Sequence, residues 1–211
     1  MLKQQQTLPL QTRKTQYSVH NLQLSSYVKR FEDVAPRSLI NSINKIIYKR
    51  ENFELSGTIN PDGSSDYDRK IRSVEGFTLG EKSIGTSVAK RIIYNDLIRV
   101  TNRLQQIYNE QVPYSTSHKN FDFQFLWYEA STKGHYDWHT DHHHEHAPRT
   151  YTIILGLSDD YLGGDLKVLN DNLSYKVRSN QAVMFPSNFA FPHKVEKVIQ
   201  GERKVLVIWI N

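Results

Sequence analysis

The sequence predicts a mainly β domain, either a sandwich or a jelly-roll barrel, backed by helices. Three observations support this fold class. Two segments with helical apolar spacing lie before residue 121, and short strand-like runs separated by turns follow it. The chain shows no strand-helix-strand alternation, which argues against a parallel α/β fold. Its 211 residues are enough to bury a core.

The composition is that of a globular protein, with 38% hydrophobic and 23% charged residues and no cysteine. The lack of cysteine excludes disulfides, thiolate metal sites and cysteine nucleophiles, so any metal must be bound by histidine and carboxylate. No apolar run reaches the roughly 20 residues of a membrane span. The first residues also lack the apolar segment and cleavage site of a secretory signal. We therefore expect a cytoplasmic protein with no membrane partner.

The net charge of +5 is concentrated near the N-terminus. Residues 1–50 carry nine Lys or Arg and two acidic residues, whereas residues 51–211 carry 18 Lys or Arg and 20 acidic residues. Basic residues on solvated helix faces explain this excess, and a phosphate-tracking patch is the alternative. The distribution argues against nucleic acid as a partner.

The chain is expected to form a short arm and a single domain. Residues 1–20 are polar and aperiodic, which predicts a polar arm. A single domain would then cover 21–211, with helical support over 21–120 and a β core over 121–211.

Two helices are predicted within the support. Pro36 can begin the first, because an apolar stripe follows it. The second keeps three-and-four apolar spacing from Val88 to Ile107, until Pro113 ends it. Between them, residues 57–76 are rich in Gly, Ser, Asp and Pro, which predicts a long loop followed by at most a short strand.

The side chains of residues 121–130 would alternate strictly between the two faces of a strand, with one face toward a helix layer and the other toward a barrel lumen. The helix-facing side chains would be Phe121, Phe123, Phe125 and Trp127, and the lumen-facing ones Asp122, Gln124, Leu126 and Tyr128.

Six further strands are predicted from short runs rich in β-branched and aromatic residues. Turns are expected at the sequences DDYLGG, NDN, RSN and IQGE, which separate several of these runs. The strands would occupy residues 150–157, 165–169, 174–178, 181–185, 193–198 and 203–210.

A dense group of histidines marks the candidate site, since six of the nine histidines lie within residues 135–146. His139 and Asp141 are two residues apart, so on extended backbone their side chains point the same way and can bind one metal. His193, beside a proline at the head of a later strand, would add a second imidazole. Two imidazoles and one carboxylate leave open metal positions, which suits Fe(II), whereas a closed zinc site needs four protein ligands.

A buried arginine is the second signal. Arg203 shares a strand face with apolar residues, so its guanidinium points into the interior and needs an anionic partner. Its planar fork suits a small carboxylate ligand. The hydroxyl groups of Tyr128 and Tyr136 could bind the same ligand.

Three segments together resemble the catalytic domain of the prolyl 4-hydroxylase-type Fe(II)/2-oxoglutarate-dependent dioxygenases. They are YEASTKGHYDWHTD, RTYTIILGLSDDYLGGDLKVL and VMFPSNFAFPHKVEKVIQGERKVLVIWI. The HTD motif, the GGDL turn, the FPS segment before His193 and the basic Arg203 ten residues after it occur in the family's order. The resemblance covers about residues 120–211, and the preceding helices resemble the family's N-terminal support.

The resemblance implies an α+β, mainly β fold whose catalytic core is a double-stranded β-helix, or jelly roll, backed by N-terminal helices. It implies Fe(II) and 2-oxoglutarate as cofactors, dioxygen as a co-substrate and ascorbate as a reductant. The iron ligands, and thus catalytic residues, would be His139, Asp141 and His193, and the 2-oxoglutarate 5-carboxylate would pair with Arg203, assisted by Tyr128 or Tyr136.

The expected activity is hydroxylation of a prolyl residue in a protein or peptide, with decarboxylation of 2-oxoglutarate to succinate. Three alternatives stay open. The same iron chemistry could act on a free amino acid, another side chain or a nucleic-acid base; the barrel could be a catalytically silent binding module; or the three ligands could hold a hydrolytic zinc.

Two features depart from the family. Collagen-type members carry lysine where this chain has Arg203, and an arginine here resembles the oxygen-sensing and bacterial branches of the family. The run His142–His146 is also unlike the family, and a polar loop is favoured over a stray metal site or a substrate entrance.

For Trp138 we favour a core position, with substrate contact as the alternative. Arg149 is expected to contact substrate or to be a surface charge.

Overall fold

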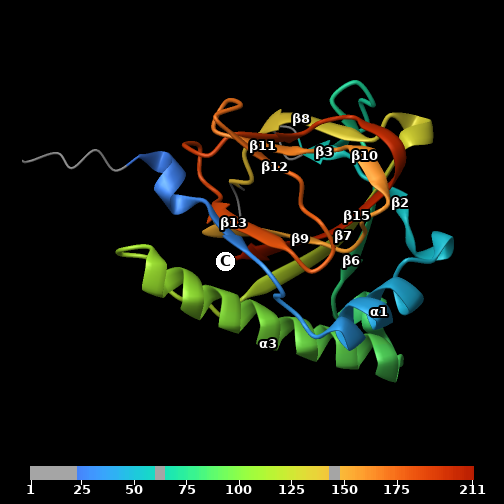
Figure 1. Ribbon diagram of the computed structural model, residues 1–211. Coiled ribbons are helices and arrows are strands. Elements are labelled where there is room, and N and C mark those ends of the chain that lie inside the picture. Colours follow the sequence, from blue (N-terminus) through green and yellow to red (C-terminus); the bar gives the residue numbers. More distant parts are fainter. Residues whose placement is uncertain (1–22, 60–64, 143–147) are drawn as a thin grey trace, which may run out of the picture.

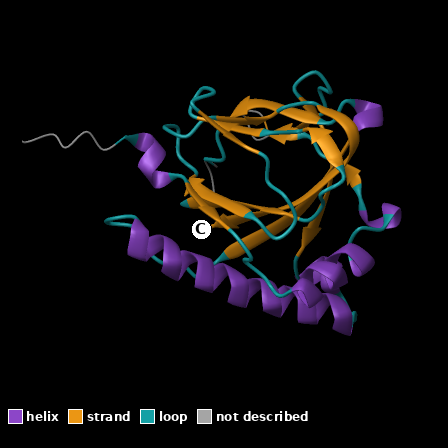
Figure 2. Ribbon diagram, in the orientation of Figure 1, coloured by secondary structure: helices purple, strands orange, loops and turns teal. Residues whose placement is uncertain are grey.

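The computed structural model describes residues 23–59, 65–142 and 148–211. Two antiparallel β-sheets face each other, and the helices lie against the outer face of the larger sheet (Figure 1, Figure 2). The polar arm expected over residues 1–20 lies outside the described residues, as does most of the histidine run.

The larger sheet has the strand order β1-β13-β9-β15-β7-β6-β2, and β10 also pairs with β15. Its strands are β1 (Lys29–Phe31), β2 (Glu54–Leu55), β6 (Glu75–Leu79), β7 (Phe121–Glu129), β9 (Tyr151–Gly156), β10 (Tyr161–Gly163), β13 (Ala182–Pro186) and β15 (Val198–Ile210).

The smaller sheet has the order β12-β11-β14-β8-β5, and β3 and β4 form a separate pair. These strands are β3 (Thr58–Ile59), β4 (Ser65–Asp66), β5 (Arg72–Ser73), β8 (His135–His139), β11 (Leu166–Val168), β12 (Leu173–Tyr175) and β14 (His193–Val195).

The helices match the two predicted segments. α1 (Arg37–Ile46) follows Pro36, and α3 (Val88–Gln111) ends before Pro113. A short α2 (Glu81–Ile84) precedes α3. The remaining helical turns are the 3-10 helices η1 (Leu24–Tyr27), η2 (Arg50–Asn52) and η3 (Ala130–Thr132). Within the described part of the chain, no helix combines the length and apolar character needed to span a membrane.

Two hydrophobic cores follow from the alternation of β7. Phe123, Phe125 and Trp127 pack in the core between the helices and the larger sheet. Leu126 and Tyr128 belong to the second core, between the two sheets. The predicted assignment of faces in this strand is therefore correct, and the expected mainly β jelly roll backed by helices is confirmed.

The segment 57–76 contains more strand than the sequence indicated. β5 joins the smaller sheet, and β6, which begins at Glu75, pairs with β7 through five residue pairs. The edge of β7 carries backbone groups that need hydrogen-bond partners, and β6 supplies them. This requirement comes from the neighbouring strand, so local sequence does not reveal it.

Two segments expected to be turns are also strands. β15 begins at Val198, so it includes the IQGE sequence, and β10 lies within the DDYLGG sequence. Gly201 permits this pairing: it has φ +75°, and a Cβ there would lie 2.0 Å from the carbonyl oxygen of Asp160. The β10 pair therefore depends on a close backbone approach that only glycine allows.

The helix layer is expected to stabilise the fold through its buried face. Leu97 in α3 is 0% exposed, so Leu97→Ala should lower the free energy of unfolding by about 2–5 kcal/mol. Ile92 lies on the same helix but is 56% exposed, so Ile92→Ala should change it by about 0.5 kcal/mol or less. Urea unfolding of both variants measures the difference, and equal losses would contradict this packing.

Candidate metal centre

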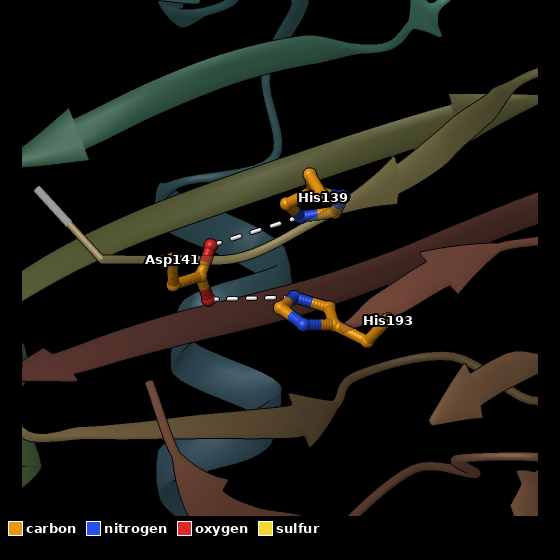
Figure 3. A group of neighbouring side chains, drawn as sticks. All are labelled: His139, Asp141 and His193. Carbon is orange, nitrogen blue, oxygen red and sulfur yellow. Dashed lines mark ion pairs between the residues drawn. The ribbon is translucent and has the colours of Figure 1, made fainter. Parts of the chain in front are cut away.

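The pairing of β8 with β14 brings together the three predicted metal ligands. His139, at the end of β8, is the direct register partner of His193, at the start of β14. Asp141 follows His139 by two residues, and ligand atoms of all three residues lie within 4.8 Å of one another. Figure 3 shows the carboxylate of Asp141 facing both imidazoles, with one dashed line to each.

A β-bulge in β8 shapes one wall of this cluster. His193 pairs with His139 and Val195 pairs with Tyr136, so β8 contains one residue more than β14 over this stretch. In a regular strand, residues three apart point to opposite faces. The bulge lets Tyr136 and His139 stack, with ring centroids 3.5 Å apart.

Backbone carbonyls fix the orientation of both imidazoles. The Nδ1 of His139 lies 2.7 Å from the carbonyl oxygen of Asp137, and the Nδ1 of His193 lies 3.2 Å from that of Phe191. A carbonyl can only accept a hydrogen bond, so each Nδ1 is the donor and carries the proton. In the neutral rings, both Nε2 lone pairs then face Asp141, at 3.7 Å from Oδ1 for His139 and 3.5 Å from Oδ2 for His193.

The electrostatics of the cluster call for a cation. Burial, followed by the nearby charge of His193, lowers the pKa of His139 to about 3, so this imidazole is neutral near pH 7. Burial alone would raise the pKa of Asp141, but His193 lowers it below its usual range. When both imidazoles are neutral, their Nε2 lone pairs give the buried carboxylate no counter-charge, which a metal ion would supply. Two nitrogen donors and one oxygen donor fit a divalent metal with open positions.

Arg203 is buried in the same inter-sheet space. The residue is 1% exposed, and none of its side-chain nitrogens has a hydrogen-bond partner among the described residues. Gly164 makes room for its stem, since a Cβ there would lie 2.9 Å from Cδ of Arg203. A buried guanidinium without a partner needs an anion, and a carboxylate matches its fork. The chemistry of Arg203 therefore suits a small carboxylate ligand.

Two predicted tyrosines lie beside these groups. The guanidinium carbon of Arg203 is 4.9 Å from the ring centroid of Tyr128, which is 2% exposed. Burial raises the pKa of both Tyr128 and Tyr136, despite the opposing charges of Arg203 and Arg72 respectively. Both hydroxyl groups therefore stay protonated and can donate hydrogen bonds.

Trp138 and Arg149 occupy different environments. Trp138 is 37% exposed, so the expected core position is wrong; β8 ends beside it and its ring lies 4.7 Å from the Nζ of Lys194. Arg149 stacks on Trp209 at 3.6 Å, and its Nη1 lies 3.4 Å from the backbone oxygen of Asp141. It is thus half-buried next to the cluster rather than a plain surface charge.

Four residues near the cluster were not identified from the sequence. Arg72 lies 4.5 Å over the ring of Tyr136, from a segment expected to be loop. Tyr161 lies near Arg203 because β10 pairs with β15. Thr152 and Ser187 are buried, and Ser187 is hydrogen-bonded to Thr152, which is hydrogen-bonded to Asp141. A buried threonine within the apolar run of β9 is a weak signal, and the FPS segment contains Ser187 without assigning it a role. The positions of Arg72 and Tyr161 depend on tertiary pairing.

Comparison with known proteins agrees with this donor set. The model of the family described as 2OG-Fe(II) oxygenase superfamily matches residues 123–211, which include all three ligands and Arg203. Residues 123–211 are therefore similar to the 2OG-Fe(II) oxygenases. The family's description names the two cofactors expected from the sequence, and the resemblance found there is confirmed.

Two curated relatives are PKHD-type hydroxylases of Prochlorococcus marinus. The protein of strain MIT 9301 is 26% identical over 145 residues, which cover 63% of this chain and 64% of that protein. The protein of strain AS9601 is 36% identical over 64 residues, which cover 29% of this chain and 28% of that protein. In these matches the chain spans less than two thirds of the relatives' own length.

Two solved structures share the fold of this chain. A Pseudomonas putida prolyl-4-hydroxylase has a TM-score of 0.67 at 17% identity, covering 88% of this chain and 92% of that chain. A Trichoplax adhaerens prolyl hydroxylase, in complex with a peptide fragment of hypoxia inducible factor, has a TM-score of 0.68 at 17% identity, covering 88% and 84%. At this identity the likeness concerns the double-stranded β-helix.

The environment of His139 predicts a specific acid sensitivity of the metal-free protein. The folded state keeps this imidazole neutral down to about pH 3, whereas the unfolded chain protonates it below its usual pKa of 6.5. Acidification therefore favours the unfolded state, and at pH 5 the loss should be about 2 kcal/mol relative to pH 8.

Urea unfolding of the wild type and of His139→Gln at both pH values isolates this contribution, because the other titrating groups are shared. The variant should lose about 2 kcal/mol less than the wild type on acidification. Parallel losses in the two proteins would show that His139 is not held neutral by its surroundings.

Proposed function

We propose that this chain is an Fe(II)/2-oxoglutarate-dependent dioxygenase that hydroxylates a prolyl residue in a protein or peptide. The observation that carries the proposal is the partnerless, buried guanidinium of Arg203 in the same lumen as His139, Asp141 and His193. A metal cluster alone fits several chemistries. The same cluster together with a buried guanidinium that can bind a carboxylate favours a reaction that uses a small dicarboxylate as a ligand.

The three metal ligands and Arg203 would divide the cofactor binding between them. His139, Asp141 and His193 would hold Fe(II), and Arg203 would bind the 5-carboxylate of 2-oxoglutarate, with Tyr128 as a hydrogen-bond donor. Bound Fe(II) and 2-oxoglutarate supply oxidation by dioxygen: 2-oxoglutarate is converted to succinate and CO2, and one oxygen atom enters a C–H bond of the substrate. The protein's part is to bind, orient and exclude water.

Residues next to the cluster support a substrate larger than a free amino acid. Trp138 is exposed at the end of β8, Arg149 is fixed on the ring of Trp209, and Arg72 rests on Tyr136. We propose Trp138 and Arg149 as substrate contacts. Backbone carbonyls of an extended peptide are acceptors that arginines can bind. The PKHD-type hydroxylases and the peptide-bound prolyl hydroxylase among the similar proteins support the same substrate class.

Several accompanying features belong to the same proposal. Dioxygen is the co-substrate, and ascorbate is the reductant to include in assays. We infer a cytoplasmic location from the composition of the sequence. A hydrolytic zinc would use the same three ligands but gives Arg203 no partner, so the geometry favours the oxygenase.

The proposed activity can be tested by measuring succinate with proline-containing peptides. Wild-type protein with Fe(II), 2-oxoglutarate and ascorbate should form succinate, and mass spectrometry should find one added oxygen on a peptide proline. His139→Ala should reduce both products to background, because it removes a metal ligand. Succinate without peptide oxidation would redirect the search to free amino acids, other side chains or bases. No succinate from folded, iron-loaded protein would support a silent module.

The role of Arg203 gives a prediction that separates ligand binding from folding. Arg203→Met removes an uncompensated buried charge, so the ligand-free variant should be as stable as the wild type or more stable by about 1–4 kcal/mol. In the Mn(II)-loaded protein, the rise in Tm caused by 2-oxoglutarate should be lost. Thermal unfolding with and without the ligand measures both effects.

Lys204→Met is the matched control for this experiment. Lys204 is the next residue of β15, points to the other side of the sheet and stacks on Trp127. The control should keep the 2-oxoglutarate response. An Arg203→Met protein that is strongly destabilised yet still responds to 2-oxoglutarate would assign Arg203 a structural role.

A further inference from the structure

Two buried hydroxyl groups form a chain that ends on the carboxylate of Asp141. Thr152 Oγ1 lies 2.8 Å from Oδ2 of Asp141, and Ser187 Oγ lies 2.8 Å from Thr152 Oγ1. Thr152 is 0% exposed and Ser187 is 1% exposed. Thr152 belongs to β9 and Ser187 follows β13, so the chain crosses from two neighbouring strands of the larger sheet to the metal cluster.

The chemistry of these groups fixes the direction of the hydrogen bonds. An ionised carboxylate only accepts, so the hydroxyl of Thr152 donates to Asp141. Its single proton is then committed, and Ser187 must donate to Thr152. The backbone N–H of Ser187 donates to the carbonyl of Thr150 at 3.0 Å, which holds the start of the chain in place. Consecutive donation in one direction strengthens each bond.

We infer that Thr152 and Ser187 are positioning residues that restrict Asp141 to binding metal through Oδ1. Thr152 occupies Oδ2, and turning the carboxylate to offer both oxygens to a metal would break a buried hydrogen bond. Oδ1 lies 3.7 Å from Nε2 of His139, whereas Oδ2, which accepts from Thr152, lies 3.5 Å from Nε2 of His193. Both hydroxyl residues act through Asp141 and do not contact the metal position themselves.

This inference rests on the proposed function and adds a reason for the hydroxyl chain. Fe(II) in such sites uses six positions, and a carboxylate that binds through one oxygen leaves three of them open. A 2-oxoglutarate bound through two of its oxygens, together with dioxygen, would need all three. A carboxylate bound through both oxygens would remove one of these positions.

Metal binding without turnover tests the inference. Metal-free protein is titrated with Mn(II), and free Mn(II) is measured by electron paramagnetic resonance. Thr152→Val keeps the side-chain shape but removes the donor, and should weaken Mn(II) binding about tenfold or more. Thr152→Ser keeps the donor and should bind nearly as the wild type does. Ser187→Ala should show a smaller loss, because Thr152 can still donate.

Thr101→Val is the matched control. Thr101 is 0% exposed and donates to the carbonyl of Leu97 within α3, outside the metal cluster. The control should bind Mn(II) with wild-type affinity. Circular dichroism is used to check that each variant is folded. If Thr152→Val does not fold, the Mn(II) affinity of Ser187→Ala tests the inference.

Visible spectra of the Co(II)-loaded proteins supply a second readout, because the intensity of the bands depends on the number of ligands. Thr152→Val should change the spectrum, and Thr152→Ser should restore it. Wild-type Mn(II) affinity in both Thr152→Val and Ser187→Ala would overturn the inference, as would weaker binding with an unchanged Co(II) spectrum. A wild-type protein that binds no metal would instead overturn the proposed function and the inference together.

Discussion

The register between β8 and β14 is the constraint on which the site depends. It makes His139 and His193 direct neighbours across two strands, and the bulge in β8 sets Tyr136 against the ring of His139. Shifting either strand by one residue would move an imidazole to the opposite face of the sheet. Backbone carbonyls then fix each ring, so the lone pairs converge on Asp141. The metal centre is therefore a consequence of strand pairing, supported by local hydrogen bonds.

The larger sheet connects this centre to the rest of the molecule. Its outer face is buried by α1 and α3, while its inner face supplies Arg203 from β15 and Thr152 from β9. The helices hold the sheet rigid. The polar groups on its inner face are therefore already held in position before any ligand binds. The core between the helices and the larger sheet stabilises the fold. The core between the two sheets adjoins the polar groups that we propose bind metal and anion.

Most of the fold and the centre of the site could be predicted from the sequence, because those features follow from local residue patterns. Helical spacing identified α3, alternation identified both faces of β7, and the motif at His139 and Asp141 indicated the residues that the structure brings together with His193. Features created by tertiary pairing were not accessible. β6 and β10 form because neighbouring strands need partners, and Arg72 reaches the cluster from a segment without a chemical motif. Ser187 belongs to the FPS segment noted in the sequence, but its link to Asp141 through Thr152 depends on the pairing of β13 with β9. The exposure of Trp138 likewise depends on where β8 ends.

The central claim is that one lumen binds Fe(II) and 2-oxoglutarate together. An anaerobic titration of metal-free protein with Fe(II) and then 2-oxoglutarate tests it most directly, because a chelate of both gives a visible charge-transfer band without any substrate. The account predicts this band in the wild type, no band in His139→Ala, and a band in Arg203→Met only at much higher 2-oxoglutarate concentration. Folded wild-type protein that binds Fe(II) but shows no band on addition of 2-oxoglutarate would contradict it.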